Sequence, residues 1–125
     1  MGQAVNAKHA KIAKMKTVSY ETVRQIALAF PNVEDGLSYA APALKVSGKL
    51  MVRLRDDLEA IVVKTTFAER EELMAAEPNV YFITDHYLNY EWVLVSLADV
   101  SEDALRDLIR RAHALASSEK KRTNS

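Results

Sequence analysis

The alternation of apolar and polar positions predicts three helices, and the last of them is the clearest. Between residues 101 and 118, apolar residues recur every three or four positions, which places them on one face of a helix. Ser101 precedes this stripe as an N-cap, and Glu102 and Asp103 follow in the first turn, where carboxylates suit the helix dipole. The stripe consists of Leu105, Leu108, Ile109, Ala112, Leu115 and Ala116.

Two shorter helices are predicted upstream. Ser19 is placed to cap the first, and Pro31 ends it. Thr66 and Glu69 have the spacing of a capping box, which opens the second. The apolar stripe of the first is Val23, Ile26, Ala27 and Phe30, and the buried residues expected in the second are Phe67, Leu73 and Met74.

Five strands are predicted between and after these helices. Three aliphatic runs separated by turn residues form a meander, and two more follow the second helix. The runs are Ala43–Val46, Leu50–Arg55, Leu58–Thr65, Val80–Ile83 and Trp92–Leu97.

Register can be predicted from the same pattern, because a slip of one residue would bury charged side chains. We expect a three-residue loop at Ser47–Lys49, which aligns Leu44 and Val46 with the apolar positions of the next strand. A two-residue turn at Asp56-Asp57 would then pair Val52 with Ile61. The opposite face of the meander would carry Lys45, Met51, Arg53, Arg55, Ala60, Val62 and Lys64.

The predicted order of elements is α-β-β-β-α-β-β-α, an α+β domain with a five-stranded antiparallel sheet and helices packed on one face. The segment Pro31–Pro42 is expected to be a loop, with Asp35-Gly36 as its turn signal. We expect one domain over 18–118. A basic extension over 1–17, either disordered or a short helix, precedes it, and a basic tail over 119–125 follows.

Composition is that of a soluble globular protein. The 125 residues fit one domain, and contents of 49% hydrophobic and 27% charged residues are ordinary. There is no cysteine, which excludes disulfides and thiolate metal sites. No apolar run approaches the roughly 20 residues of a membrane span, and the N-terminus lacks the apolar core of a signal peptide. We therefore expect a cytoplasmic protein without a membrane partner.

The formal net charge of zero hides an uneven distribution. Residues 18–118 hold 10 basic and 16 acidic residues, whereas 1–17 hold four lysines and no acid. Basic ends of this kind can bind polyanions or can simply be solvated.

Motifs for catalysis and for cofactors are missing. The chain has no phosphate loop, dinucleotide fingerprint, Gly-x-Ser-x-Gly or His-Glu-x-x-His, and three glycines in all. Asp85 and His86 are adjacent, so on a strand they would point to opposite faces and would not chelate one ion easily. We expect no enzymatic activity, no cofactor, no metal site and no catalytic residue.

The cationic side of the meander is the stronger indication of function. Lys45, Arg53, Arg55 and Lys64 could neutralise phosphates. Five of the nine aromatic residues lie between Tyr81 and Trp92, and rings there could stack on bases. The alternative is a solvated face whose long side chains cover a small apolar floor.

Several segments together resemble a known family. They are Ser38-Tyr39-Ala-Ala-Pro42-Ala-Leu-Lys45-Val-Ser-Gly48-Lys49, Arg53-Leu54, Lys64, Phe67-Ala-Glu-Arg70-Glu, Glu77-Pro78, Thr84-Asp85-His86-Tyr87, Tyr90 and Trp92-Val-Leu-Val95. The chain resembles the MmcQ/YjbR-like family of small bacterial proteins over about residues 18–117. The resemblance implies an α-β(3)-α-β(2)-α fold, similar in architecture to type III secretion chaperones, and a DNA-binding label.

Transferred residue by residue, the resemblance implies functional positions at Lys45, Lys49, Arg53, Lys64, His86 and Trp92. With Arg55 and Tyr87 from the residue pattern, these form the predicted nucleic-acid-binding set. Two departures stand out. Many relatives have Gly-Thr before the proline, where this chain has Ala40-Ala41, and the basic extension over 1–17 is not part of the family pattern.

Three functions are therefore open. The first is non-enzymatic nucleic-acid binding on the cationic face, where five phosphate contacts would give a log K against log salt slope of about −4 to −5. The second is a chaperone-like module that binds a protein partner. The third is a small-ligand or enzymatic site near His86, Tyr87 and Trp92.

Overall fold

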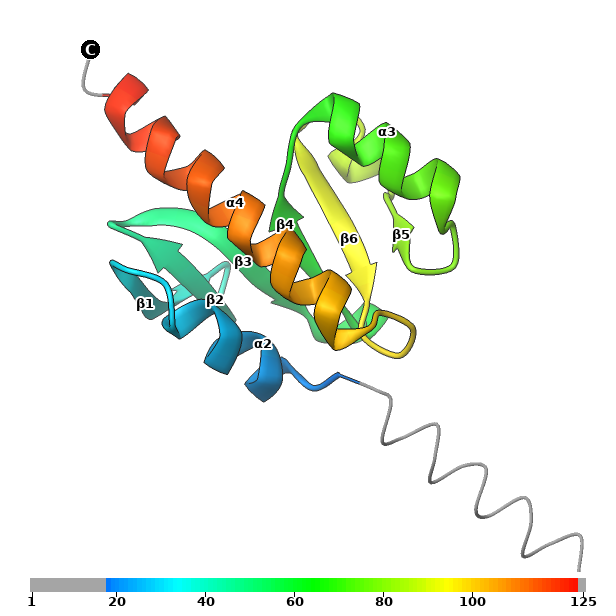
Figure 1. Ribbon diagram of the computed structural model, residues 1–125, viewed down its shortest axis with the longest axis horizontal. Helices are drawn as coiled ribbons and strands as arrows, with labels where there is room; N and C mark the ends of the chain where they lie inside the picture. The colour runs from blue at the N-terminus through cyan, green and yellow to red at the C-terminus, as the bar shows by residue number, and fades with distance from the viewer. Residues whose placement is uncertain (1–17, 124–125) are drawn as a thin grey trace, which may run out of the picture.

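The computed structural model describes residues 18–123, and the predicted basic extension over 1–17 lies outside the described residues (Figure 1). The helices are α2 (Tyr20–Leu28), α3 (Phe67–Ala76) and α4 (Glu102–Thr123). The strands are β1 (Val33–Ser38), β2 (Ala41–Val46), β3 (Lys49–Arg55), β4 (Ala60–Lys64), β5 (Tyr81–Phe82) and β6 (Trp92–Ser96). Two 3-10 turns, η1 (Asp56–Leu58) and η2 (Asp85–Tyr87), complete the set. The backbone of most of the predicted tail over 119–125 thus continues α4.

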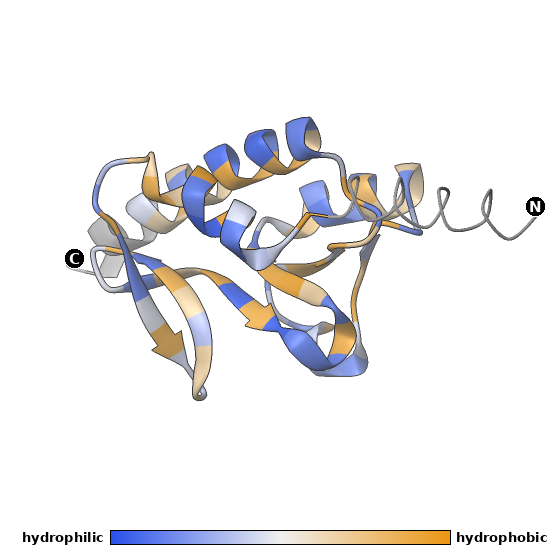
Figure 2. Cartoon of the chain, turned by 90° about the horizontal axis from the view of Figure 1, so that it is seen from below, coloured by the Kyte–Doolittle hydropathy of each residue, from blue (hydrophilic) through white to orange (hydrophobic). Residues whose placement is uncertain are grey.

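All strands pair antiparallel in one sheet of order β1-β2-β3-β4-β6-β5. The α+β class is confirmed, with α2 and α4 packed on one face and α3 beside β5 and β6. Figure 2 shows the helices on one side of the sheet and the β1–β2 hairpin reaching away from them. We call the face turned away from α4 the open face.

The sheet has six strands, so the predicted number of five was wrong. The extra strand, β1, lies in the segment predicted to be a loop. Its sequence Val-Glu-Asp-Gly-Leu-Ser has little apolar character, because β1 is an edge strand stabilised mainly by backbone pairing with β2. Asp35-Gly36 lies within the strand, and Asp35 forms an ion pair with Arg24 of α2, with Arg24 Nε 2.9 Å from Asp35 Oδ1.

The β2–β3 hairpin turns through two residues, Ser47 and Gly48, so the predicted three-residue loop was wrong. Both have positive φ, as a tight hairpin turn requires. A β-bulge then shifts the register, and beyond it Leu44 pairs with Val52, the pairing that the longer loop had predicted. Because of the bulge, Met51 is buried in the main core rather than on the open face.

The β3–β4 connection also differs from the predicted two-residue turn. Arg55 pairs with Ala60, and the four intervening residues contain η1 and Glu59 in a left-handed conformation (φ 51°). Val52 therefore pairs with Val63 rather than Ile61. A shift of two residues leaves every side chain on its predicted face, since side chains alternate with period two.

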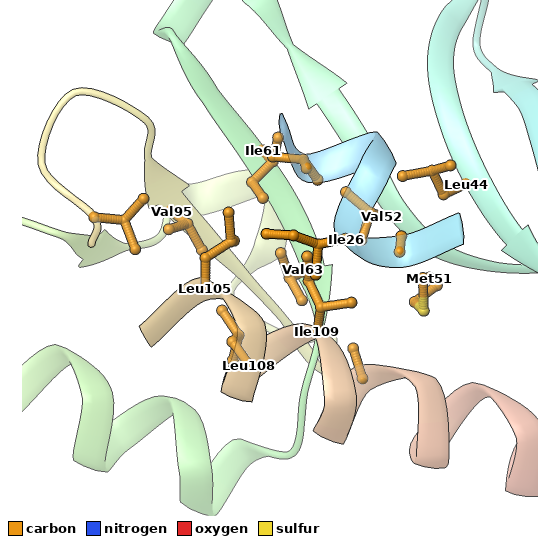
Figure 3. Close-up of a cluster of buried hydrophobic side chains, with 14 of the residues drawn as sticks. Ile26, Leu44, Met51, Val52, Ile61, Val63, Val95, Leu105, Leu108 and Ile109 are labelled. Atoms are coloured by element: carbon orange, nitrogen blue, oxygen red, sulfur yellow. The ribbon is translucent and has the colours of Figure 1, made fainter. Parts of the chain in front are cut away.

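The main core lies between the sheet and α2 with α4. Figure 3 shows Leu105, Leu108 and Ile109 of α4 among sheet residues such as Ile61 and Val63. The predicted α4 stripe is confirmed, with Leu115 half-buried and its other members buried. Side-chain caps at Ser19, Thr66 and Ser101 are confirmed as well.

One expectation for α3 was wrong. Phe67 is 43% exposed, whereas Arg70 on the same helix is only 5% exposed. Leu73 and Met74 are half-buried against the main core. The helix therefore turns an arginine, not a phenylalanine, toward the interior.

The β1–β2 turn stores backbone strain that can be tested. Tyr39 and Ala40 have φ of 52° and 66°, although neither is glycine. A left-handed conformation costs an L-residue roughly 1–2 kcal/mol, against roughly 0.5–1 kcal/mol for the extra chain entropy of glycine. We predict that Ala40→Gly raises the free energy of unfolding by about 0.5–1 kcal/mol in urea denaturation. Ala41→Gly, in β2, should lower it by about the same amount, and a lower stability for Ala40→Gly would contradict the prediction.

Candidate functional site

A groove of about 800 Å³ opens on the open face, between the β1–β2 turn and the connection from β5 to β6. It combines aromatic rings and guanidinium groups over a small apolar floor. Its lining residues are Ser38, Tyr39, Leu50, Arg53, Arg55, Leu58, Val62, Thr84, His86, Tyr87, Tyr90 and Trp92.

The floor of the groove belongs to a second, smaller apolar cluster. Ala60 and Val62 of β4 and Leu94 of β6 are fully or almost fully buried there, and Tyr87 covers them with only 7% of its surface exposed. Alternate residues of β4 thus serve the main core and the groove floor, so this strand is buried on both faces. The Tyr87 ring is fixed by apolar packing, and only its hydroxyl is left to make polar contacts.

The aromatic wall is held by Arg70. Its Nη1 donates to the carbonyl oxygens of Tyr87 (3.0 Å), Tyr90 (2.7 Å) and Trp92 (3.1 Å), and its Nη2 donates to that of Leu88 (3.0 Å). Among the described residues, Arg70 forms no ion pair. Four carbonyls of an irregular segment therefore compensate for burial of the guanidinium, and they fix residues 87–92 in return.

A second contact ties the same segment to the start of α3. The backbone amide of Phe67 donates to Glu91 Oε2 (3.1 Å), and the amide of Thr65 donates to the carbonyl of Glu91 (3.1 Å). The Phe67 ring lies 5.0 Å from the Arg70 guanidinium carbon. The start of α3 and the aromatic wall are thus positioned as one unit.

Two arginines converge on Tyr87 from the opposite wall. Arg53 Nη1 and Arg55 Nη1 donate to the Tyr87 hydroxyl oxygen at 3.3 and 3.2 Å. Arg53 Nε also donates to the carbonyl of Ser38 (3.1 Å), and its guanidinium carbon lies 5.4 Å from the centroid of the Tyr39 ring. Arg53 therefore links the β1–β2 turn to the aromatic wall across the groove.

The electrostatic settings of these two arginines differ. Arg55 forms a bidentate pair with Asp57, at 3.0 and 2.8 Å. Hydrogen bonding from Arg55 lowers the pKa of the Asp57 carboxyl below its usual value, and the same contact raises the pKa of Arg55. Arg53 forms no ion pair within the described part of the chain. Two guanidiniums therefore face the groove, and one carboxylate, Asp57, neutralises one of the two positive charges.

The structure brings together five of the eight predicted binding residues. Arg53, Arg55, His86, Tyr87 and Trp92 all line the groove. The His86 ring stands edge-on to Tyr87, with their centroids 4.8 Å apart. Among the described residues, no hydrogen bond joins it to Asp85.

The three predicted lysines lie elsewhere. Lys64 lies next to the groove, where its Nζ is 5.1 Å from the centroid of the Trp92 ring. Lys45 is opposite Glu34 of β1, outside the lining, and Lys49 pairs with Val46 at the β2–β3 turn. Of the predicted cationic side of the meander, the groove therefore contains only the two arginines, Arg53 and Arg55, and Lys64 lies next to it.

Sequence reasoning missed two residues of the site. Tyr39 lies in a segment predicted to be a loop, and the residue pattern gives it no role beyond its place in a family motif. Arg70 was likewise noted only within a motif, although an arginine at a helix position expected to face inward is a signal for a buried polar role.

Metal-binding clusters and membrane-spanning helices are both missing from the described residues. No three histidine or acidic side chains come together in a way that could hold a metal ion. No helix there has the length and apolar character needed to cross a bilayer.

Arg70 gives a direct test of how the site is held. We predict that Arg70→Met lowers the free energy of unfolding by about 3 kcal/mol or more, because four backbone carbonyls lose a charged donor whose own side chain is buried. It should also red-shift the emission of Trp92, the single tryptophan. Arg106→Met on the exposed side of α4 is the matched control, expected within about 0.5 kcal/mol of the parent. Equal effects of the two substitutions would show that the carbonyl contacts do not hold the wall.

Comparisons with known proteins agree with this architecture. The YjbR family model matches residues 28–115, which include every strand and the whole groove. The crystal structure of Deinococcus radiodurans protein DR2400, described with the domain DUF419, aligns with a TM-score of 0.66 and 21% identity. The alignment covers 80% of this chain and 78% of that chain, and at this identity it shows the shared fold. A search of the curated proteins gave no significant match. Since the family model covers most of the described domain, the chain belongs to the YjbR family.

Proposed function

We propose that the protein binds single-stranded nucleic acid in the groove and catalyses no reaction on it. The observation that carries the proposal is the convergence of Arg53 and Arg55 on Tyr87, beside the exposed rings of Tyr39 and Tyr90. Non-specific single-strand binders combine cations for the backbone with aromatic faces for the bases.

The shape and charge of the domain favour a single strand over a duplex. Tyr39 is 90% exposed and Tyr90 58% exposed, so their faces are available for stacking, which a duplex does not offer along its length. Residues 18–118 carry 16 acidic and 10 basic residues, whereas duplex-binding domains are usually basic. Within residues 18–118, the groove is where two arginines lie beside exposed aromatic rings.

The structure changes the expected salt dependence. Of the five cations first expected to contact phosphate, two line the groove and Lys64 lies beside it. Two or three phosphate contacts on a single strand give a log K against log salt slope of about −1.4 to −2.1, rather than −4 to −5.

This slope and its dependence on the arginines are testable by fluorescence anisotropy with a labelled single-stranded oligonucleotide. We predict that Arg53→Gln weakens binding by about tenfold or more at low salt and reduces the slope by about 0.7. Arg106→Gln, which removes one positive charge far from the groove, should change neither quantity beyond experimental error. No binding of the parent chain at low salt, or equal effects of the two substitutions, would refute the proposal.

A protein partner is the second candidate function, because apolar side chains surround the same groove. Leu37 is 63% exposed and Tyr39 90% exposed at the β1–β2 hairpin, and Leu58 and Tyr90 are also exposed. Affinity capture from a cell extract, with and without nuclease, separates the two functions. A partner that survives nuclease and is lost in Tyr39→Ser would favour protein binding, whereas loss of every partner after nuclease would count against it.

A further inference from the structure

The groove contains a cluster of donors that matches one particular part of a nucleic acid. We propose that Arg53, Arg55 and Tyr87 form a subsite for a terminal phosphate, the phosphomonoester at the end of a strand or on a free nucleotide. This inference rests on the proposed function, because it names the group that the groove recognises. Three observations support it: the donor inventory, the charge balance and the surrounding carboxylates.

The donor inventory points to an anion. A tyrosine hydroxyl has two lone pairs and one proton. Both lone pairs of Tyr87 face guanidinium N–H groups, from Arg53 and Arg55. The hydroxyl proton of Tyr87 is then the one group left to donate, and none of the described residues accepts a hydrogen bond from it. The three side chains together therefore present donors and no acceptor toward the groove, which suits a ligand made of acceptor oxygens.

The net positive charge of the subsite attracts a phosphomonoester more strongly than an internal phosphodiester, because the phosphomonoester carries more negative charge. The two Nη1 atoms contact the same oxygen, so two positive charges are held close together, and Asp57 neutralises only one of them. A phosphomonoester carries about −1.5 to −2 charges at neutral pH, compared with one for an internal phosphodiester. The terminal group therefore gains more from this pair of cations.

The surroundings favour the end of a chain over its middle. An internal phosphate requires the strand to leave the subsite in two directions. The η1 connection beyond Arg55 carries Asp56, Asp57 and Glu59, and Asp85 lies in sequence between the lining residues Thr84 and His86. A strand that continued along either connection would run beside acidic residues, whereas a strand that ends at the subsite needs one exit only.

The test compares one oligonucleotide sequence in three forms, with a 5′-phosphate, with a 3′-phosphate and with hydroxyls at both ends. We expect at least one phosphorylated form to bind about tenfold to a hundredfold more tightly than the hydroxyl form, the range for added charge-assisted hydrogen bonds. Equal affinities of all three forms would overturn the terminal-phosphate inference while leaving single-strand binding intact. Failure of all three to bind would overturn both.

Two variants separate recognition from folding. Tyr87→Phe keeps the ring that covers the apolar floor and removes only the hydroxyl, so it should lose most of the preference for the phosphorylated form over the hydroxyl form. Arg106→Gln should keep the full preference. A Tyr87→Phe variant that melts at the parent temperature and still prefers the phosphorylated end would overturn the assignment of Tyr87.

The source of the phosphate is resolved by competition with a free nucleoside monophosphate. Displacement of the phosphorylated strand only at much higher nucleotide concentration supports recognition of a strand end. Displacement at equal concentration supports the phosphate subsite but overturns single-strand binding as the function, because the rest of the strand would then contribute nothing.

Discussion

The arrangement of the groove depends on the burial of Arg70 among four backbone carbonyls. The segment that carries Tyr87, Tyr90 and Trp92 is mostly irregular. Its own turns give the Tyr87 and Tyr90 carbonyls one backbone N–H each, and Arg70 supplies further donors to the segment. A guanidinium supplies several donors in a rigid fork, which a lysine ammonium does not. Because Arg70 has no carboxylate partner within the described residues, it and the segment stabilise each other, and neither is well placed without the other.

The position of this segment is also fixed by the sheet on which Tyr87 packs. β4 is buried on both faces, with Ile61 and Val63 in the main core and Ala60 and Val62 under Tyr87. Most antiparallel sheets of this size leave one face to water, so a second apolar cluster requires a cover. Tyr87 provides that cover with its ring, and its hydroxyl then lies at the level of the arginine side chains. Tyr87 thus connects the two features, because its ring packs on the second apolar cluster and its hydroxyl accepts hydrogen bonds from both arginines.

Much of the fold could be predicted from the sequence, because apolar periodicity reports directly on burial. It gave the helices, five strands and the correct face for Arg53 and Arg55, even where the predicted register was off by two residues.

Apolar periodicity missed β1, since an edge strand is specified by backbone pairing and not by apolar side chains. It also missed the bulge at Met51, because a bulge and a longer loop give the same pairing of Leu44 with Val52. Lys45 was predicted from its charge on the meander and Lys49 from the family resemblance, whereas their positions outside the groove lining follow from tertiary placement. The position of Arg70 on its helix signals burial, but the sequence does not identify its partners, because they are carbonyls of residues 17 to 22 positions away.

The walls of the groove are joined by the protein's own contacts, and this bears on affinity. A guanidinium has five N–H donors. Arg53 uses one on the Ser38 carbonyl and one on Tyr87, and Arg55 uses two on Asp57 and one on Tyr87. Donors therefore remain on both arginines while the side chains stay anchored by the others. A ligand can add hydrogen bonds without breaking the contacts that position its partners, so it avoids much of the entropic cost of ordering two long side chains. The strained turn at Tyr39 and Ala40 fits this interpretation, because Arg53 holds that turn against the aromatic wall and so sets the width of the groove.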